Sequence, residues 1–147
     1  MRNNNEIVIL IAEDDDGHAE LIVEGLRETG LKNQIIRFDN GQDIWDFLTD
    51  VFEDKNQHKN QHKNIEYLVL LDINMPLVDG TEVLRRIKNH DDMKNIPVIM
   101  LTTTDDPREI EKCYQLGCNV YITKPVEFIK FAETLQKLGY FLQIIKV

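Results

Sequence analysis

Short apolar runs alternate with helical patterns along most of this chain. The runs cover residues 7–12, 35–38, 67–71, 98–101 and 120–122. Each run is shorter than a typical helix and nearly continuous in apolar residues, which predicts a strand buried on both faces of a parallel sheet. The segments between them repeat apolar residues at intervals of three and four, which predicts helices. Five such alternations indicate an α/β fold, a doubly wound parallel sheet of five strands with five helices.

Residues at the expected helix ends support this division. Asp15 and Asp16 can cap the first helix, and Gly30 stands where that helix would stop. Pro107 fits the first turn of the fourth helix, with Asp105 or Asp106 as its cap. The residues expected to face inward from the five helices are Ala19, Ile22, Val23 and Leu26; Ile44, Leu48, Val51 and Phe52; Gly80, Val83, Leu84 and Ile87; Ile110, Cys113 and Tyr114; and Phe128, Phe131, Ala132, Leu135 and Leu142.

Reactive polar residues follow four of the five predicted strands. Glu13 and Asp14 follow the first strand, and Asp72 follows the third. Thr102 ends the fourth strand, and Lys124 follows the fifth. Ligands of an open α/β sheet bind just outside the carboxyl ends of its strands, so we expect these side chains to meet at one edge. Carboxylates, a hydroxyl and an ammonium together suit a divalent cation and a phosphoryl group.

Length and charge fit one globular domain that covers residues 1–147. A net charge of −9 argues against direct nucleic-acid binding, which needs a basic face. No stretch approaches the roughly 20 apolar residues of a membrane span, and residues 1–5 lack the apolar core of a signal peptide. The two cysteines, Cys113 and Cys118, are too few for a disulfide framework. We therefore expect reduced thiols in a cytoplasmic protein.

A polar tract precedes the third strand. Residues 53–64 contain the sequence Asn-Gln-His-Lys twice in tandem. Such a tract buries too little apolar surface to offset the cost of ordering, so it predicts a mobile loop. His58 and His62 have the spacing that lets two imidazoles share a metal on a helix, but we interpret the repeat as a solvated duplication.

The C-terminal segment, residues 140–147, is unusually apolar. Its apolar members include Phe141, Leu142 and Ile145. The segment can extend the fifth helix, which should begin near Val126, or it can contact another chain. We expect contact with a second copy in a homodimer, because apolar surface left in water costs about 25 cal/mol per Å² and the core should be complete by Gly139. These three residues would lie near the centre of that interface.

The order and spacing of the polar motifs resemble the receiver domain of two-component response regulators. The resemblance runs from about Glu6 to Gly139 and includes the segment Leu-Asp-Ile-Asn-Met-Pro at residues 71–76. It implies a flavodoxin-like sheet with strand order 2-1-3-4-5. It also implies a phosphorelay function, in which a sensor histidine kinase donates a phosphoryl group from a phosphohistidine. A receiver catalyses only its own phosphorylation and dephosphorylation, so no turnover of an external substrate is expected.

The resemblance assigns a nucleophile and a metal site. Asp72 would accept the phosphoryl group. Mg²⁺ would be held by Asp72 and Asp14, by Glu13 through a water molecule, and by the backbone carbonyl of Asn74. The metal reduces the repulsion between the attacking carboxylate and the anionic donor.

The resemblance also assigns the remaining catalytic and switch residues. Lys124 would pair with Asp72 before phosphorylation and with a phosphoryl oxygen afterwards, and Thr102 would donate its hydroxyl to another oxygen. The peptide bond between Lys124 and Pro125 would be cis. Tyr121 occupies the aromatic switch position, whose ring turns inward when the threonine moves.

A narrower resemblance concerns single-domain receivers that serve cyanobacterial phytochromes. It rests on the length of the fifth helix with its apolar tail, the loop before the third strand, and the segment Asn-Met-Pro at residues 74–76. It implies a phytochrome as the kinase partner and a homodimer that pairs through the fourth helix, the fifth strand and the fifth helix.

Three alternatives use similar features. A phosphatase of the haloacid dehalogenase type needs a second aspartate two positions after the nucleophile, where this chain has Asn74. A nucleotide- or flavin-binding module needs a phosphate-cradling loop after the first strand, and the acidic run at residues 13–16 would repel phosphate without a metal. A degenerate receiver that only binds partners would lack an acidic residue or the lysine, and this chain keeps them all.

Overall fold

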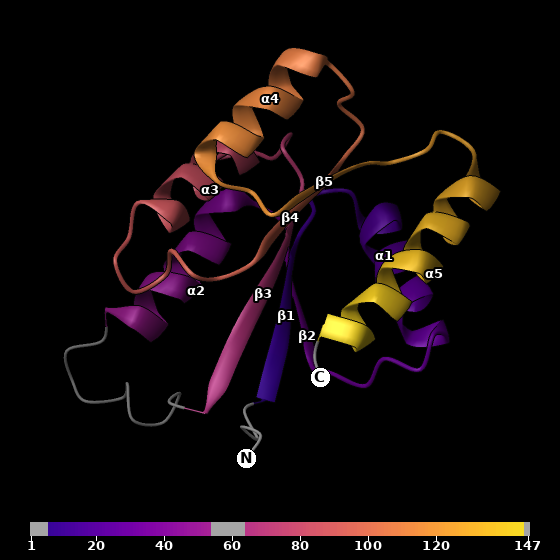
Figure 1. Cartoon of the computed structure of the whole chain (residues 1–147), viewed down its shortest axis with the longest axis horizontal. Coiled ribbons are helices and arrows are strands. Elements are labelled where there is room, and N and C mark those ends of the chain that lie inside the picture. The colour runs from indigo at the N-terminus through magenta and orange to yellow at the C-terminus, as the bar shows by residue number, and fades with distance from the viewer. Residues whose placement is uncertain (1–5, 54–63, 146–147) are drawn as a thin grey trace.

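The computed structural model describes residues 6–53 and 64–145 as a five-stranded parallel sheet with helices on both faces (Figure 1). The strand order is β2-β1-β3-β4-β5, which confirms the expected doubly wound, flavodoxin-like architecture. The tandem repeat with His58 and His62 lies outside the described residues. The elements are β1 (Glu6–Ala12), α1 (Asp16–Glu28), β2 (Ile35–Phe38), α2 (Gly41–Phe52), β3 (Ile65–Leu71), α3 (Gly80–Lys88), β4 (Val98–Thr102), α4 (Pro107–Leu116), β5 (Val120–Thr123) and α5 (Phe128–Ile145).

Side chains alternate between the two faces of the sheet. Val8, Leu10 and Ala12 of β1 pack with α2 and α3, whereas Ile9 and Ile11 pack with α1 and α5. In Figure 1, α1 and α5 cover one face and α2, α3 and α4 cover the other. The connections after β1 and β3 therefore leave the sheet toward opposite faces. Ligands of such sheets bind outside the carboxyl ends of two neighbouring strands whose connections leave in this way.

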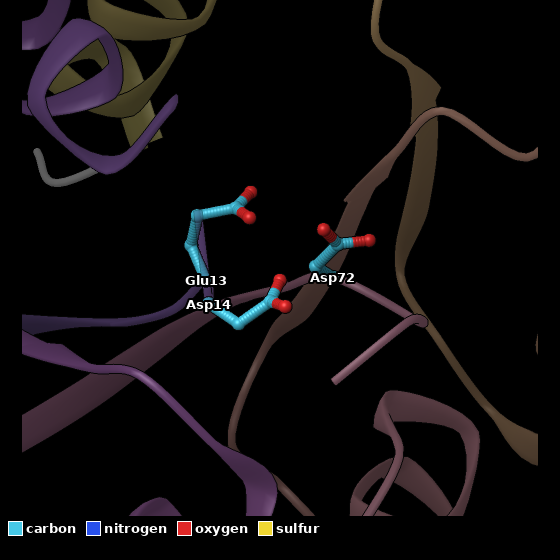
Figure 2. Close-up of side chains that lie close together, drawn as sticks. All are labelled: Glu13, Asp14 and Asp72. Atoms are coloured by element: carbon cyan, nitrogen blue, oxygen red, sulfur yellow. The ribbon is translucent and has the colours of Figure 1, made fainter. Parts of the chain in front are cut away.

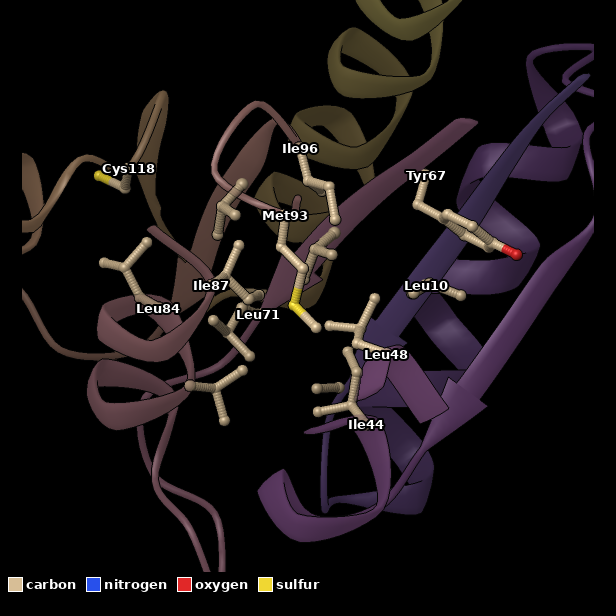
Figure 3. Packing of buried hydrophobic residues seen from close by; sticks show 14 of the residues in the cluster. Leu10, Ile44, Leu48, Tyr67, Leu71, Leu84, Ile87, Met93, Ile96 and Cys118 are labelled. Atoms are coloured by element: carbon tan, nitrogen blue, oxygen red, sulfur yellow. The ribbon is translucent and has the colours of Figure 1, made fainter. Parts of the chain in front are cut away.

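The larger of the two apolar clusters fixes these strand ends in place. Figure 3 shows Leu10 and Leu71 of the strands close to Leu48 of α2 and Ile87 of α3. All four side chains are fully buried. Because interiors are packed as densely as organic crystals, the last residues of β1 and β3 have little freedom to shift. Glu13 and Asp72, which directly follow these strands, are therefore held in fixed positions at the backbone.

Helix caps confirm several of the expected boundaries. Asp15 caps α1 by accepting a hydrogen bond from the His18 N–H at 2.9 Å. Asp106, the second of the two candidates, caps α4 by accepting from the Arg108 N–H at 2.9 Å. Gly117 ends α4 with a φ of 108°, a left-handed conformation that glycine adopts without the Cβ penalty.

Two residues expected to face inward are exposed. Tyr114 lies along the edge strand β5, where its hydroxyl accepts a hydrogen bond from the Tyr121 N–H at 3.0 Å and its side chain stays accessible to water. Phe128 is exposed because α5 begins at this residue and not at Val126, so its side chain lies before the first buried turn.

The C-terminal segment continues α5 over the domain's own core. Leu142 is only 4% exposed and belongs to the apolar cluster between the sheet and α1 and α5. The Gln143 Nε2 donates hydrogen bonds to the backbone oxygen and the hydroxyl of Thr29, both at 3.0 Å. The expectation that the core ends at Gly139 is therefore wrong, because the last turn of α5 still covers the end of α1.

This arrangement also corrects the expected dimer residues. Leu142 is buried in its own domain and is not available as the centre of an interface between copies. Phe141 and Ile144 are 44% and 71% exposed. The side chain of Ile145 lies outside the described part of the structure. No helix within residues 6–53 and 64–145 combines the length and the hydrophobicity needed to cross a bilayer.

Gly80 allows α3 to begin directly behind Asp72. A Cβ at this position would lie 1.9 Å from the Asp72 backbone oxygen, far inside van der Waals contact. The Gly80 N–H donates to the Ile73 oxygen at 2.8 Å, which holds the loop and the helix together. Any larger residue must push either α3 or Asp72 out of place.

We predict that Gly80→Ala destabilises the fold by at least about 2 kcal/mol, because the clash is with backbone and no side chain can move aside. Urea denaturation followed by circular dichroism measures the loss. Gly17→Ala is the matched control, since its Cβ would meet only the Asp15 carboxylate at 3.2 Å. Equal stabilities for the two variants would contradict this account of Gly80.

Candidate functional site

Three carboxylates meet at the carboxyl ends of the neighbouring strands β1 and β3. Glu13 and Asp14 directly follow β1, and Asp72 directly follows β3. Figure 2 shows the three carboxylates turned toward a common space, with Asp72 opposite the other two. One oxygen from each residue can be chosen so that all lie within 4.8 Å of one another. Glu13 and Asp72 are buried, whereas Asp14 is exposed.

This set of donors fits a hard divalent cation. Mg²⁺ prefers oxygen ligands, often one or two carboxylates with water completing its shell. The exposed position of Asp14 leaves access for water and for a ligand. Three like charges this close repel each other, and a divalent cation between them would relieve that repulsion. The residues present therefore fit the metal that the sequence predicts.

Lys124 lies directly beside the carboxylates. Its Nζ pairs with Glu13 Oε1 and with Asp72 Oδ2, the latter at 3.2 Å. Its side chain is only 2% exposed. The Lys124 N–H donates to the Thr102 oxygen at 2.7 Å, which fixes the backbone at the end of β5 against β4. The Lys124–Pro125 peptide bond is trans, so the expected cis bond is wrong.

Burial is the largest influence on the pKa of Glu13, and it raises that pKa. Loss of hydration raises the pKa of Glu13 to about 7, and the negative charge of Asp72 acts in the same direction. The hydrogen bond and positive charge of Lys124 lower the pKa, but they offset only part of the effect of burial. Glu13 therefore holds a proton part of the time near neutral pH. A bound cation would favour the charged carboxylate and displace that proton.

The end of β4 contributes the buried hydroxyl of Thr102, and the loop that follows it is hydrogen-bonded to Tyr121 of β5. Thr102 Oγ1 is buried and has no hydrogen-bond partner within the described residues. Two residues later, the Thr104 backbone oxygen accepts a hydrogen bond of 2.6 Å from the Tyr121 hydroxyl. Burial raises the pKa of Tyr121 to about 12, so this hydroxyl keeps its proton. The Asn74 Nδ2 lies 3.4 Å from Thr104 Oγ1, which places the loops after β3 and β4 side by side.

Two further residues of the site were not predicted from the sequence. His18, in the first turn of α1, places its Nδ1 3.1 Å from Lys124 Nζ. Arg37 of β2 donates from Nε and Nη2 to the Glu13 backbone oxygen at 2.9 and 2.8 Å, and it pairs with Asp16 at 2.8 Å. The sequence contains a feature that could have indicated each of them. His18 lies four residues before the inward-facing Ile22, and Arg37 interrupts an apolar strand.

The chain is similar to known proteins over most of its length. The profile of the response regulator receiver domain matches residues 9–136. Response regulator Rcp1 of Synechocystis sp. is 34% identical over 122 residues, which cover 83% of this chain and 79% of Rcp1.

Solved structures agree with the sequence comparison. A receiver domain from Rhodospirillum rubrum superposes with a TM-score of 0.81 at 42% identity, over 93% of this chain and 94% of that one. The Mn²⁺-bound form of Rcp1 gives 0.77 at 31% identity, over 92% and 93%. The phosphorylated cyanobacterial phytochrome response regulator RcpA gives 0.75 at 27% identity, over 92% and 93%.

Fold, site and relatives lead to the same result. The strand order and the clustered carboxylates with their lysine match what the sequence motifs predicted for the carboxyl edge of the sheet. The matched profile covers well over half of the chain. The chain belongs to the response regulator receiver domain family, the phospho-accepting modules of two-component signalling.

Proposed function

We propose that this chain accepts a phosphoryl group on Asp72 from the phosphohistidine of a sensor histidine kinase, with Mg²⁺ as cofactor. The observation that carries this proposal is the convergence of Asp72 with two further carboxylates and a buried ammonium 3.2 Å away. A nucleophile for phosphoryl transfer must be fixed, partly desolvated and compensated in charge. Asp72 meets each of these conditions.

The transfer exchanges a phosphorus–nitrogen bond for a phosphorus–oxygen bond and involves no change of oxidation state. A carboxylate oxygen of Asp72 forms a bond to phosphorus while the bond between phosphorus and the donor nitrogen breaks. The donor ring leaves with the electron pair of that bond, and a proton carried by the ring or supplied by water makes it a neutral imidazole. Lys124 moves from Asp72 to a phosphoryl oxygen, and Thr102, whose hydroxyl has no partner among the described residues, donates to another. Glu13, Asp14, Asp72 and the carbonyl of Asn74 would hold Mg²⁺, which neutralises charge on the carboxylate and the phosphoryl oxygens when bound.

The output would be a conformational switch through the loop after β4. A phosphoryl group that draws the Thr102 hydroxyl toward Asp72 also moves the loop that follows it. Tyr121 is tied to that loop by its hydrogen bond to the Thr104 oxygen. Movement of the loop therefore reaches the α4 and β5 face through Tyr121, and a partner can read it there.

The competing functions find less support. The position two residues after Asp72 is an asparagine, which lacks the acid that an aspartyl phosphatase uses. A degenerate receiver would not keep three carboxylates clustered, with a lysine paired to two of them. We infer a signalling module that modifies only itself and turns over no external substrate. The free, buried Cys113 and Cys118 support a place in the reducing cytoplasm.

The relatives suggest the class of kinase. Two of the similar structures are Rcp1 and the phytochrome response regulator RcpA. This chain matches both over more than nine-tenths of its length. We infer that its phosphodonor is a sensor histidine kinase, with a phytochrome as the leading candidate.

We further propose that the whole chain, residues 1–147, works as one receiver domain that forms a homodimer through α5. Leu142 anchors the last turn of the helix on its own core, and this fixes Phe141 and Ile144 on the outer surface. Tyr140, which is 58% exposed, extends the same surface. A second copy offers an equivalent apolar surface, and symmetric pairing buries both at once.

Asp72→Asn should abolish phosphorylation while leaving the fold intact, because the amide nearly keeps the shape of the side chain but cannot act as the nucleophile. Intact-mass spectrometry after incubation with Mg²⁺ and acetyl phosphate checks this. Asp79→Asn is a matched control, since Asp79 only caps α3. An Asp72→Asn protein that gains one phosphoryl mass at the wild-type rate would place the acceptor elsewhere.

Asp14→Ala should remove most of the Mg²⁺ affinity without unfolding the protein. In the absence of metal its stability should equal or exceed that of the wild type, because one of three repelling charges is gone. Calorimetric titration with Mg²⁺ and thermal unfolding measure the two effects. Asp16→Ala removes the same charge from a residue that pairs with Arg37, and it should bind Mg²⁺ nearly as the wild type does. Unchanged affinity in Asp14→Ala would locate the metal at another site.

Ile144→Glu should convert the dimer to a monomer, because it places a charge in the proposed apolar interface. Ile129→Glu is the control, since both isoleucines are 71% exposed and lie near opposite ends of the same helix. Sedimentation velocity over a range of concentrations, with and without a phosphoryl mimic, separates the two states. A wild-type protein that stays monomeric throughout would rule out the dimer.

A further inference from the structure

The ammonium group of Lys124 is fully occupied by three neighbours. A protonated lysine carries three N–H donors and no acceptor. The Lys124 Nζ has Glu13 Oε1, Asp72 Oδ2 at 3.2 Å and His18 Nδ1 at 3.1 Å around it. Two of these partners are carboxylate oxygens, and the third is a ring nitrogen. The histidine thus completes the set without adding a negative charge.

The lysine determines which form of the imidazole is present. Because the ammonium can only donate, His18 Nδ1 must accept, and the neutral ring then carries its proton on Nε2. An imidazolium would lack a lone pair at Nδ1 and would repel Lys124. The contact therefore requires the neutral tautomer with the Nε2 proton.

The position of the ring is fixed from two sides. The His18 N–H donates to the capping carboxylate of Asp15 at 2.9 Å, which holds the residue in the first turn of α1. Its ring meets Phe131 of α5 edge to face, with centroids 5.8 Å apart and an interplanar angle of 82°. The ring is half-buried. Because the His18 ring is already fixed, it can hold the Lys124 ammonium in one position with little further loss of conformational entropy.

The three partners of Lys124 have different roles during phosphoryl transfer. Under the proposed function, Asp72 forms a bond to phosphorus and Glu13 turns to the metal. His18 has neither task, so it can keep its contact with the lysine throughout the transfer. We propose that His18 is a positioning residue for phosphoryl transfer, which holds Lys124 beside the phosphoryl group while the two carboxylates exchange their roles.

This inference rests on the proposed function and predicts a specific pair of variants. His18→Leu keeps an apolar side chain against Phe131 but removes the acceptor. His18→Asn places an amide oxygen close to where Nδ1 lies and restores the acceptor. His90→Leu is the control, because His90 is a half-buried histidine that pairs with Glu53 at 2.8 Å through contacts unconnected with Lys124.

Phosphorylation by acetyl phosphate with saturating Mg²⁺ tests the proposal, with intact mass as the readout over time. For His18→Leu we expect the maximal rate to fall about tenfold while the half-saturating donor concentration stays within about twofold, since the contact acts on the transferring group. His18→Asn should recover most of the rate. Thermal unfolding and Mg²⁺ titration should stay close to the wild type for both variants, which a purely structural role would not predict.

The results that would overturn the inference are distinct. A wild-type rate in His18→Leu would do so, as would an equally slow His18→Asn or an equal loss in His90→Leu. In each of these cases the proposed function stands, provided that the wild type is phosphorylated and Asp72→Asn is not. A wild type that takes up no phosphoryl group would instead remove the proposed function and this inference together.

Discussion

The buried ammonium of Lys124 is the interaction on which the carboxyl edge of the sheet depends. Three carboxylates that share so small a space carry three negative charges, and the lysine supplies one positive charge. The remainder is two negative charges when all three carboxylates are ionised, which a single divalent cation neutralises. Without the lysine, two buried carboxylates would face each other with no compensation, an arrangement that costs several kcal/mol per ion.

The same charge balance explains why the metal-free site is tolerable. Burial already gives Glu13 a pKa near 7, so a proton can replace part of the missing positive charge. The stability of the metal-free domain and its readiness for a cation are then two results of one arrangement. A site with a fully ionised, unpaired cluster would be harder to fold, and one with a second lysine would bind the cation less well.

Sequence periodicity predicted the alternating α/β architecture, and the polar residues at the strand ends predicted most of the site. The strand order and the roles of the site residues came from the resemblance to receiver domains. Five buried runs with helices between them permit few topologies, and a parallel sheet brings residues such as Asp72 and Lys124 to one edge. Contacts that depend on helix rotation were missed. His18 reaches Lys124 because the first turn of α1 points its third residue toward the carboxyl edge of the sheet, and the capping position of Asp15 sets that rotation. The helical spacing placed Leu142 on the inward face of the fifth helix, which its burial confirms. The dimer prediction was wrong for this residue, because it took the core to end at Gly139 and local sequence does not show how far α5 extends along α1.

The last turn of α5 is held against the end of α1. Helix termini normally fray, since their final carbonyls lack partners and little burial opposes opening. Here Leu142 lies in the core and Gln143 bonds to Thr29, so fraying past this point would expose apolar surface worth about 1.5–3 kcal/mol. The terminus of the helix is thereby locked to the end of α1. Exopeptidase trimming that reaches Leu142 would cut into the domain's interior, and a fusion partner attached here must leave room for this turn.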